Sequence, residues 1–161
     1  METVAMYWES RIKTYGFQVV KNLSLYAYAF SAELWQRWKE VEADHNRFQL
    51  VCAQQGETGG LELILVCNPE QGRACARRIE SVLAKTAGEP RVTSPVELIF
   101  FQGPHFGDRF GIADFTCRAL EEQVDDLLAA LFTSASIYLV FPKGAADKAR
   151  DRLAAAFRVP R

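Results

Sequence analysis

The chain has 161 residues, and 49% of them are hydrophobic, which is enough to bury the core of one ordinary domain or of two small ones. Its 19 basic and 20 acidic residues are interspersed and give a formal net charge of -1, so the sequence lacks the basic footprint of a protein that binds nucleic acid or an anionic membrane. The longest apolar runs are far shorter than the roughly 20 residues that span a bilayer, and no basic segment precedes an apolar one at the N-terminus. We therefore expect a soluble, cytoplasmic protein with no nucleic-acid or membrane partner.

The residues that most often bind metals do not form a pattern in this sequence. The four cysteines lie in apolar segments without CxxC spacing, and the two histidines are far apart: Cys52, Cys67, Cys75, Cys117, His45 and His105. The cysteines are expected to be small buried side chains. We predict no metal site and no cofactor.

The first half of the chain reads as strand, helix, hairpin and helix. Residues 11–20 and 23–30 alternate or run apolar with β-branched and aromatic side chains, as strands do. Residues 31–45 have helical spacing, with Leu34, Trp38 and Val41 on one face and Ser31 as the N-cap. Residues 48–55 and 61–67 are expected to pair as a hairpin. Residues 69–88 form a second amphipathic helix, which places Cys75, Ile79, Val82 and Leu83 on one face and ends at Gly88.

The second half repeats this order after a short strand candidate at residues 90–94. An apolar strand at 96–101 is followed by a loop, a helix at 111–122, strands within 124–134 and 136–141, and a helix at 145–157. An offset of 74 residues lays Leu65 on Leu139, Val66 on Val140 and Arg78 on Arg152. The matching order of elements indicates a tandem repeat.

The repeat predicts an α+β fold. Each helix has one apolar stripe to bury, so each unit is expected to be a ferredoxin-like (βαββαβ) module, an antiparallel sheet with helices on one face. The predicted modules are residues 12–94 and 95–161. The second module ends too early to supply its last strand, so we expect residues 11–20 to fill that edge and to interlock the two modules.

The loop GPHFGDRFGI, Gly103 to Ile112, admits two interpretations. Its glycines and proline are typical of a turn, and Asp108 could be the N-cap of a helix that starts at about Phe110. In the other interpretation, the free N–H groups of a helix N-terminus and the glycines at 107 and 111 admit a carboxylate. Asp108 and Asp125 would complement an ammonium group, so a free amino acid would match both ends.

The segment DRFGI, followed by FTCRALEEQVDD, TSASIYLVF and AADKARDRLAAAF, resembles the ACT domain, a small ligand-binding regulatory module. The similarity is good over Val96 to Phe157, while over Ile12 to Ala87 only the order of elements supports it. Thr133-Ser134 and the spacing from Leu153 to Phe157 resemble the paired regulatory ACT modules of aspartate kinases, which interlock in sequence.

This resemblance implies an effector site at the strand-to-helix loop, often at an interface between two modules. Asp108, Gly111 and Ile112 match the ACT motif, and Val124 and Asp125 match the start of its second strand. Phe110 and Asp126 depart from it, and residues 31–38 of the first module lack the motif, so its site is inferred to be lost. The implied ligand-binding residues are Gly107, Asp108, Arg109, Phe110, Gly111, Ile112, Val124 and Asp125.

Other functions find less support in the residues. A kinase would need hundreds more residues and a phosphate-binding loop, and the His105–Asp108 pair has no nucleophile or metal set beside it. The aromatic residues of the first half lack the neighbouring basic residues of an RNA platform. We predict a non-catalytic, amino-acid-sensing regulatory protein that forms a homodimer and partners a metabolic enzyme. The alternative is a ligand-free dimerisation or docking module for a partner enzyme.

Overall fold

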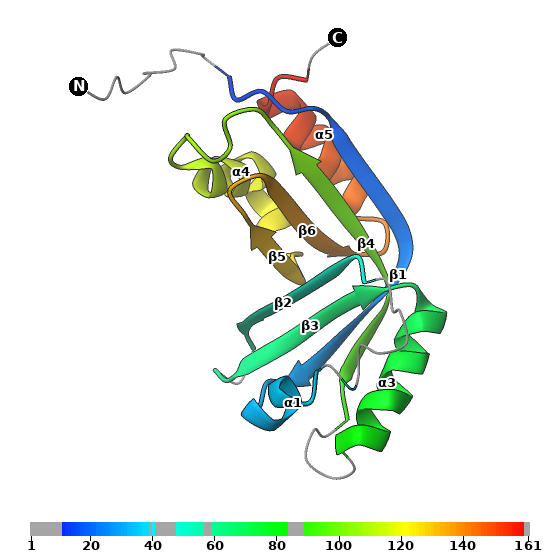
Figure 1. The fold of residues 1–161 in the computed structure, drawn as a ribbon. Coiled ribbons are helices and arrows are strands. Elements are labelled where there is room, and N and C mark those ends of the chain that lie inside the picture. Colours follow the sequence, from blue (N-terminus) through cyan, green and yellow to red (C-terminus); the bar gives the residue numbers. More distant parts are fainter. Residues whose placement is uncertain (1–10, 39, 41–47, 57–58, 84–88, 160–161) are drawn as a thin grey trace, which may run out of the picture.

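The computed structural model describes residues 11–38, 40, 48–56, 59–83 and 89–159 (Figure 1). Its elements confirm the α+β fold. In chain order they are β1 (Phe17–Ala29), α1 (Ala32–Gln36), β2 (Leu50–Gln55), β3 (Leu61–Cys67), α3 (Pro69–Leu83), β4 (Arg91–Gln102), α4 (Ile112–Leu120), the 3-10 helix η1 (Glu121–Val124), β5 (Ala129–Phe132), β6 (Ser136–Pro142) and α5 (Ala146–Ala156).

The strands form one antiparallel sheet in the order β2-β3-β1-β4-β6-β5. Its two central strands, β1 and β4, run through both halves of the molecule (Figure 1). Residues 17–20 of β1 pair with the end of β4, beside β6, while residues 24–29 pair with β3. The N-terminal strand therefore serves both halves, which confirms the predicted interlocking.

Two expectations about these strands were wrong. Residues 11–20 and 23–30 do not form two strands, because β1 continues through register shifts on both sides of Leu23, and Asn22 takes a left-handed φ of 60°. The candidate strands at 90–94 and 96–101 likewise form the single strand β4, which begins at Arg91. The division into modules 12–94 and 95–161 stays a prediction, and its boundary falls inside β4.

In each half the helices pack on one face of the strands, as predicted. α4 and α5 cover the half with β5 and β6, and α1 and α3 cover the half with β2 and β3, so the helix pairs lie at opposite ends of the molecule in Figure 1. The opposite, helix-free faces pack on each other through a third apolar cluster that includes Leu25, Ile64 and Val140. Across it, the Gln54 side-chain amide donates to the Leu128 carbonyl at 3.1 Å. The sheet thus folds back to back on itself.

Several local predictions in the first half are confirmed, although the helix predicted over 31–45 is described as α1 over Ala32–Gln36 only. The Ser31 hydroxyl caps α1 by accepting the Leu34 N–H at 3.1 Å. Cys75, Ile79 and Val82 of α3 are buried, and β2 and β3 form the predicted hairpin. The predicted positions of Val41 and Gly88 lie outside the described residues.

The core beneath α3 holds two thiols and a phenol. Cys67 and Cys75 are buried, and burial raises the pKa of Cys67 to about 11 and that of Cys75 to about 12. Burial also raises the pKa of Tyr28, whose hydroxyl has no hydrogen-bond partner among the described residues. These groups therefore hold their protons more tightly in the folded state than in the unfolded chain.

We expect stability to fall in alkaline solution. Each thiol's contribution to the free energy of unfolding is fully present below the pKa of the unfolded chain, about 8.5, and is lost as the pH rises toward the folded pKa. In that window the free energy of unfolding falls by up to about 1.4 kcal/mol per pH unit for each group. Urea denaturation between pH 7.5 and 10.5 measures this slope. Cys75→Ala should flatten it, and Cys117→Ala, at a half-buried position on α4, is the matched control. An equal slope in both variants would contradict the assignment to the buried thiol.

Candidate functional site

The predicted loop joins β4 to α4 and is anchored by one aromatic side chain. Phe106 is buried, and its ring lies 6.0 Å from that of Phe101 and 6.4 Å from that of Phe157. Around it the chain turns over residues 104–108, where His105 takes a left-handed φ of 67° and its carbonyl accepts the Asp108 N–H. The hydrophobic anchor fixes the loop against the core while the residues after it remain on the surface.

Asp108 is not the N-cap of the following helix, which corrects the turn interpretation of the sequence. The N-cap is Gly111, with a left-handed φ of 79°, so α4 begins later than Phe110. The Asp108 carboxylate instead lies 3.4 Å from His105 Nδ1, and its side chain is 77% exposed. A glycine offers no side-chain acceptor, so no described side chain caps the first turn of α4.

The other three α-helices of the described chain each have such an acceptor. Ser31 caps α1, and the Asn68 side chain accepts the Glu70 N–H in the first turn of α3 at 2.9 Å. For α5 the acceptor is Glu97 of β4, which takes the Ala146 N–H at 3.1 Å. Among the α-helices that the structure describes, only α4 has no side chain that accepts an N–H of its first turn.

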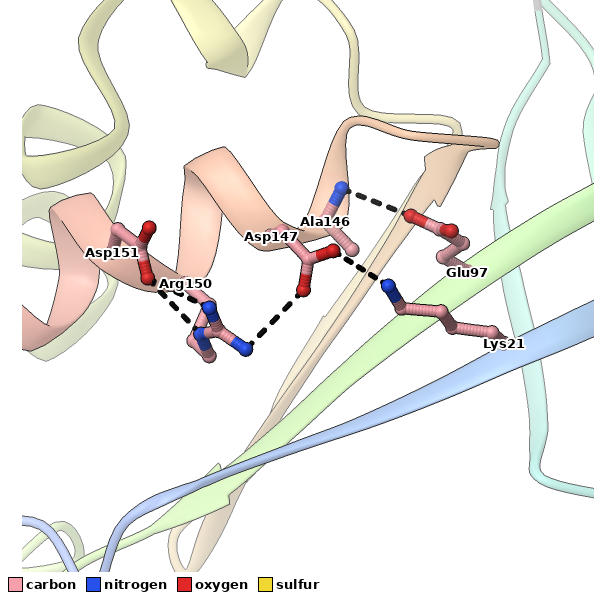
Figure 2. Close-up of polar contacts among 6 residues, drawn as sticks. All are labelled: Lys21, Glu97, Ala146, Asp147, Arg150 and Asp151. Carbon is pink, nitrogen blue, oxygen red and sulfur yellow. Dashed lines mark hydrogen bonds and ion pairs between the residues drawn. The ribbon is translucent and has the colours of Figure 1, made fainter.

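Figure 2 shows why the start of α5 is closed to an anion. The Glu97 carboxylate, 5% exposed, already occupies the helix N-terminus. Beside it, Lys21 of β1 pairs with Asp147 at 2.5 Å, and Arg150 pairs with the other carboxylate oxygen at 3.2 Å. The hydrogen bond from Lys21 holds the pKa of Asp147 below its usual range. This network also attaches the shared strand β1 to α5.

The structure brings part of the predicted site together. Gly107 lies against the β5–β6 turn, since a Cβ there would be 3.2 Å from the Ser134 carbonyl oxygen. Arg109 is half-buried, Phe110 is 100% exposed, and Ile112 points into the core at 8% exposure. Gly107 to Gly111 thus form a continuous surface beside the uncapped end of α4.

Val124 and Asp125 do not join this surface, and their predicted place at a strand start was wrong. Val124 ends η1 and packs on the core, Asp125 lies in the turn after it, and β5 begins only at Ala129. The nine residues of α4 alone separate the two ends by about 13 Å. Gly111 and Asp125 of one chain are therefore at opposite ends of this helix.

Sequence reasoning missed two features of the C-terminal half. Glu97 interrupts the apolar run VELIFF, and a charged residue inside a buried strand was an available signal for a structural role. A cavity of about 160 Å³ between residues 15–18 and 100–102 gave no signal, because these two segments meet only in the folded chain. Among the described residues no cluster of three or more His, Cys, Asp or Glu side chains could hold a metal ion. In the same part of the chain, no helix combines the length and apolarity that crossing a bilayer requires.

Two interlocked halves, each with antiparallel strands and two helices on one face, define a paired ACT-like fold. The chain is similar in structure to regulatory parts of aspartate kinases. The regulatory subunit from Thermus flavus matches with a TM-score of 0.74 and 10% identity over 92% of this chain and 100% of that one. A putative C-terminal regulatory domain of aspartate kinase from Porphyromonas gingivalis matches with a TM-score of 0.65 and 13% identity. This match covers 88% of this chain and 96% of that one.

A whole aspartate kinase shows where the similarity ends. The enzyme from Clostridium acetobutylicum matches with a TM-score of 0.72 and 13% identity over 91% of this chain but only 35% of the kinase. No protein-family model matches the sequence, and neither does any curated protein. At such identities the similarity establishes the fold, which the ACT resemblance of the sequence predicted.

Proposed function

We propose that this protein is a non-catalytic, cytoplasmic regulatory protein that senses a free amino acid at the loop before α4. The observation that carries the proposal is the uncapped N-terminus of α4, in a fold shared with regulatory subunits of aspartate kinase. In each of the other three described α-helices, a side chain of the same chain accepts an N–H of the first turn. An effector carboxylate would supply the acceptor that α4 lacks.

The exposed surface around the N-terminus of α4 offers a carboxylate to the ammonium group of a free amino acid. In the proposal, N–H groups at the start of α4 bind the carboxylate, and the 77% exposed Asp108 carboxylate binds the ammonium group. The binding residues are Gly107, Asp108, Arg109, Phe110, Gly111 and Ile112. Val124 and Asp125 lie at the other end of α4, so they would complete the site from a second copy in a homodimer.

A thermal-shift screen of the full chain with the twenty amino acids tests the proposal. One or two should raise the melting temperature, because a ligand at about 100 times its dissociation constant stabilises the folded state by about 2.7 kcal/mol. The C-terminal amide of the active amino acid should lose this effect, since it lacks the carboxylate that α4 would bind. Asp108→Ala should abolish the shift, and Asp126→Ala, which removes an exposed carboxylate outside the loop, should keep it.

The alternative function, a ligand-free dimerisation or docking module for a partner enzyme, predicts a different pair of results. No amino acid would then change the melting temperature, while light scattering at micromolar concentration would give twice the mass of the chain. A shift that persists in Asp108→Ala would place the site elsewhere. A strict monomer in light scattering, with and without the active amino acid, would contradict the homodimer.

A further inference from the structure

A second candidate site lies on the opposite, helix-free side of the C-terminal half. The cavity of about 160 Å³ opens where the N-terminal segment crosses the end of β4, and the Tyr15 N–H donates to the Gln102 carbonyl at 2.8 Å. Its lining residues are Tyr15, Gly16, Phe17, Gln18, Phe100, Phe101 and Gln102. None of them is charged, so the cavity does not suit the zwitterion proposed for the loop.

The register of the sheet places aromatic side chains along one edge of this cavity. Gln18 pairs with Phe100 across β1 and β4, and Phe100 pairs with Tyr138 across β4 and β6, so the three side chains share one face. Phe101 and Phe17 belong to the opposite face, where they pack beneath the helices. The rings of Phe100 and Tyr138 lie 4.9 Å apart, and both residues are half-buried. Tyr138 thereby fixes the plane of the Phe100 ring that borders the cavity.

The polar groups at the cavity are neutral and can both donate and accept. Gln18 and Gln102 are exposed, and each side-chain amide carries two donor hydrogens and an acceptor oxygen. Tyr15, 64% exposed, adds a second aromatic ring and a hydroxyl. Aromatic rings beside side-chain amides match a planar heterocycle, which stacks on the rings and hydrogen-bonds at its edge.

We propose that this cavity binds the base of a nucleoside-like small molecule. Aromatic side chains on neighbouring strands of a helix-free sheet face are the groups on which ferredoxin-like RNA-binding domains stack bases. Here the cavity is smaller than a typical drug-sized pocket and has no basic lining, so it admits a single ring system and no polynucleotide. The site is separate from the amino-acid site and does not depend on it.

Titration of the full chain with adenosine, followed by saturation-transfer NMR and calorimetry, tests this proposal. Adenosine should bind saturably, and benzyl alcohol, which offers a ring without ring nitrogens, should bind at least tenfold more weakly. Phe100→Ala should weaken adenosine binding at least tenfold because it removes the stacking surface. Gln18→Ala changes only an exposed amide and should weaken binding severalfold, so it tests the site even if Phe100→Ala does not fold.

The controls separate this site from the rest of the molecule. Trp35→Ala, which removes an exposed ring from the other half of the chain, and Asp108→Ala should leave adenosine binding unchanged. Three results would overturn the proposal: no saturable adenosine binding, equal affinity in the Gln18→Ala variant, or equal affinity for benzyl alcohol and adenosine. If no amino acid raised the melting temperature of the protein but adenosine still bound to it, only the proposed amino-acid function would be overturned.

Discussion

Phe157→Ala is expected to lower the free energy of unfolding by about 3–5 kcal/mol, a large part of the stability of a small protein. Phe157 follows α5, is 1% exposed, and lies at the centre of an aromatic cluster. The distances from its ring centroid to the others are 5.0 Å (Phe115), 5.3 Å (Phe101), 6.1 Å (Phe17) and 6.4 Å (Phe106). Truncation would leave a cavity that four rings from separate segments cannot fill without moving.

Urea denaturation followed by circular dichroism measures this loss. Phe110→Ala is the matched control, because Phe110 is the same residue type at 100% exposure, and its truncation should change stability by no more than about 0.5 kcal/mol. Since Phe106 anchors the loop before α4 in the same cluster, the Phe157 variant should also weaken any ligand response of that loop. Equal midpoints for the two variants would show that the cluster does not hold the C-terminal half together.

Gly103→Ala is expected to destabilise the protein by about 3 kcal/mol, the upper end of what overpacking a well-packed site costs. A Cβ at Gly103 would lie 2.5 Å from Phe106 Cε1 and closer still to the Lys13 carbonyl oxygen. The second neighbour is backbone and cannot rotate away. The segment from Ile12 to Tyr15 would have to move, although it is held by hydrogen bonds to Arg158 and Gln102.

Denaturation and amide hydrogen exchange together test this second prediction. In the variant, the amides of Thr14, Tyr15 and Arg158 should exchange faster, because their hydrogen bonds depend on the close approach at Gly103. Gly60→Ala is the control, since a Cβ there meets nothing within 4 Å. Unchanged exchange of these amides in a destabilised Gly103→Ala protein would mean that the strain is relieved elsewhere.

The elements of this fold were readable from local patterns. The apolar runs that became β3 and β6, the stripe of Cys75 and Ile79 on α3, and the Ser31 cap depend on residues close in sequence. The repeated element order also predicted the interlocking of β1, because no strand follows α5 among the described residues. Where the resemblance was carried over position by position, it failed at Val124 and Asp125. The 3-10 helix η1 follows α4 directly and covers the residues where the motif places the start of a strand.

The geometry of the candidate sites depended on contacts that form only in the folded chain. An aspartate three residues before Gly111 is a reasonable N-cap on composition, but the left-handed Gly111 starts the helix later and leaves Asp108 beside His105. The closing of α5 by Glu97 joins residues 49 positions apart. The cavity walls come from residues 15–18 and 100–102, which only the pairing of β1 with β4 brings together.

The sequence by itself determined the class of fold and most of the order of its elements, because periodicity and turn chemistry act over a few residues. Only the tertiary structure decided which helix ends are satisfied and where the sheet leaves a cavity. Those outcomes depend on contacts between segments many tens of residues apart, whose geometry is set when the two halves pack back to back.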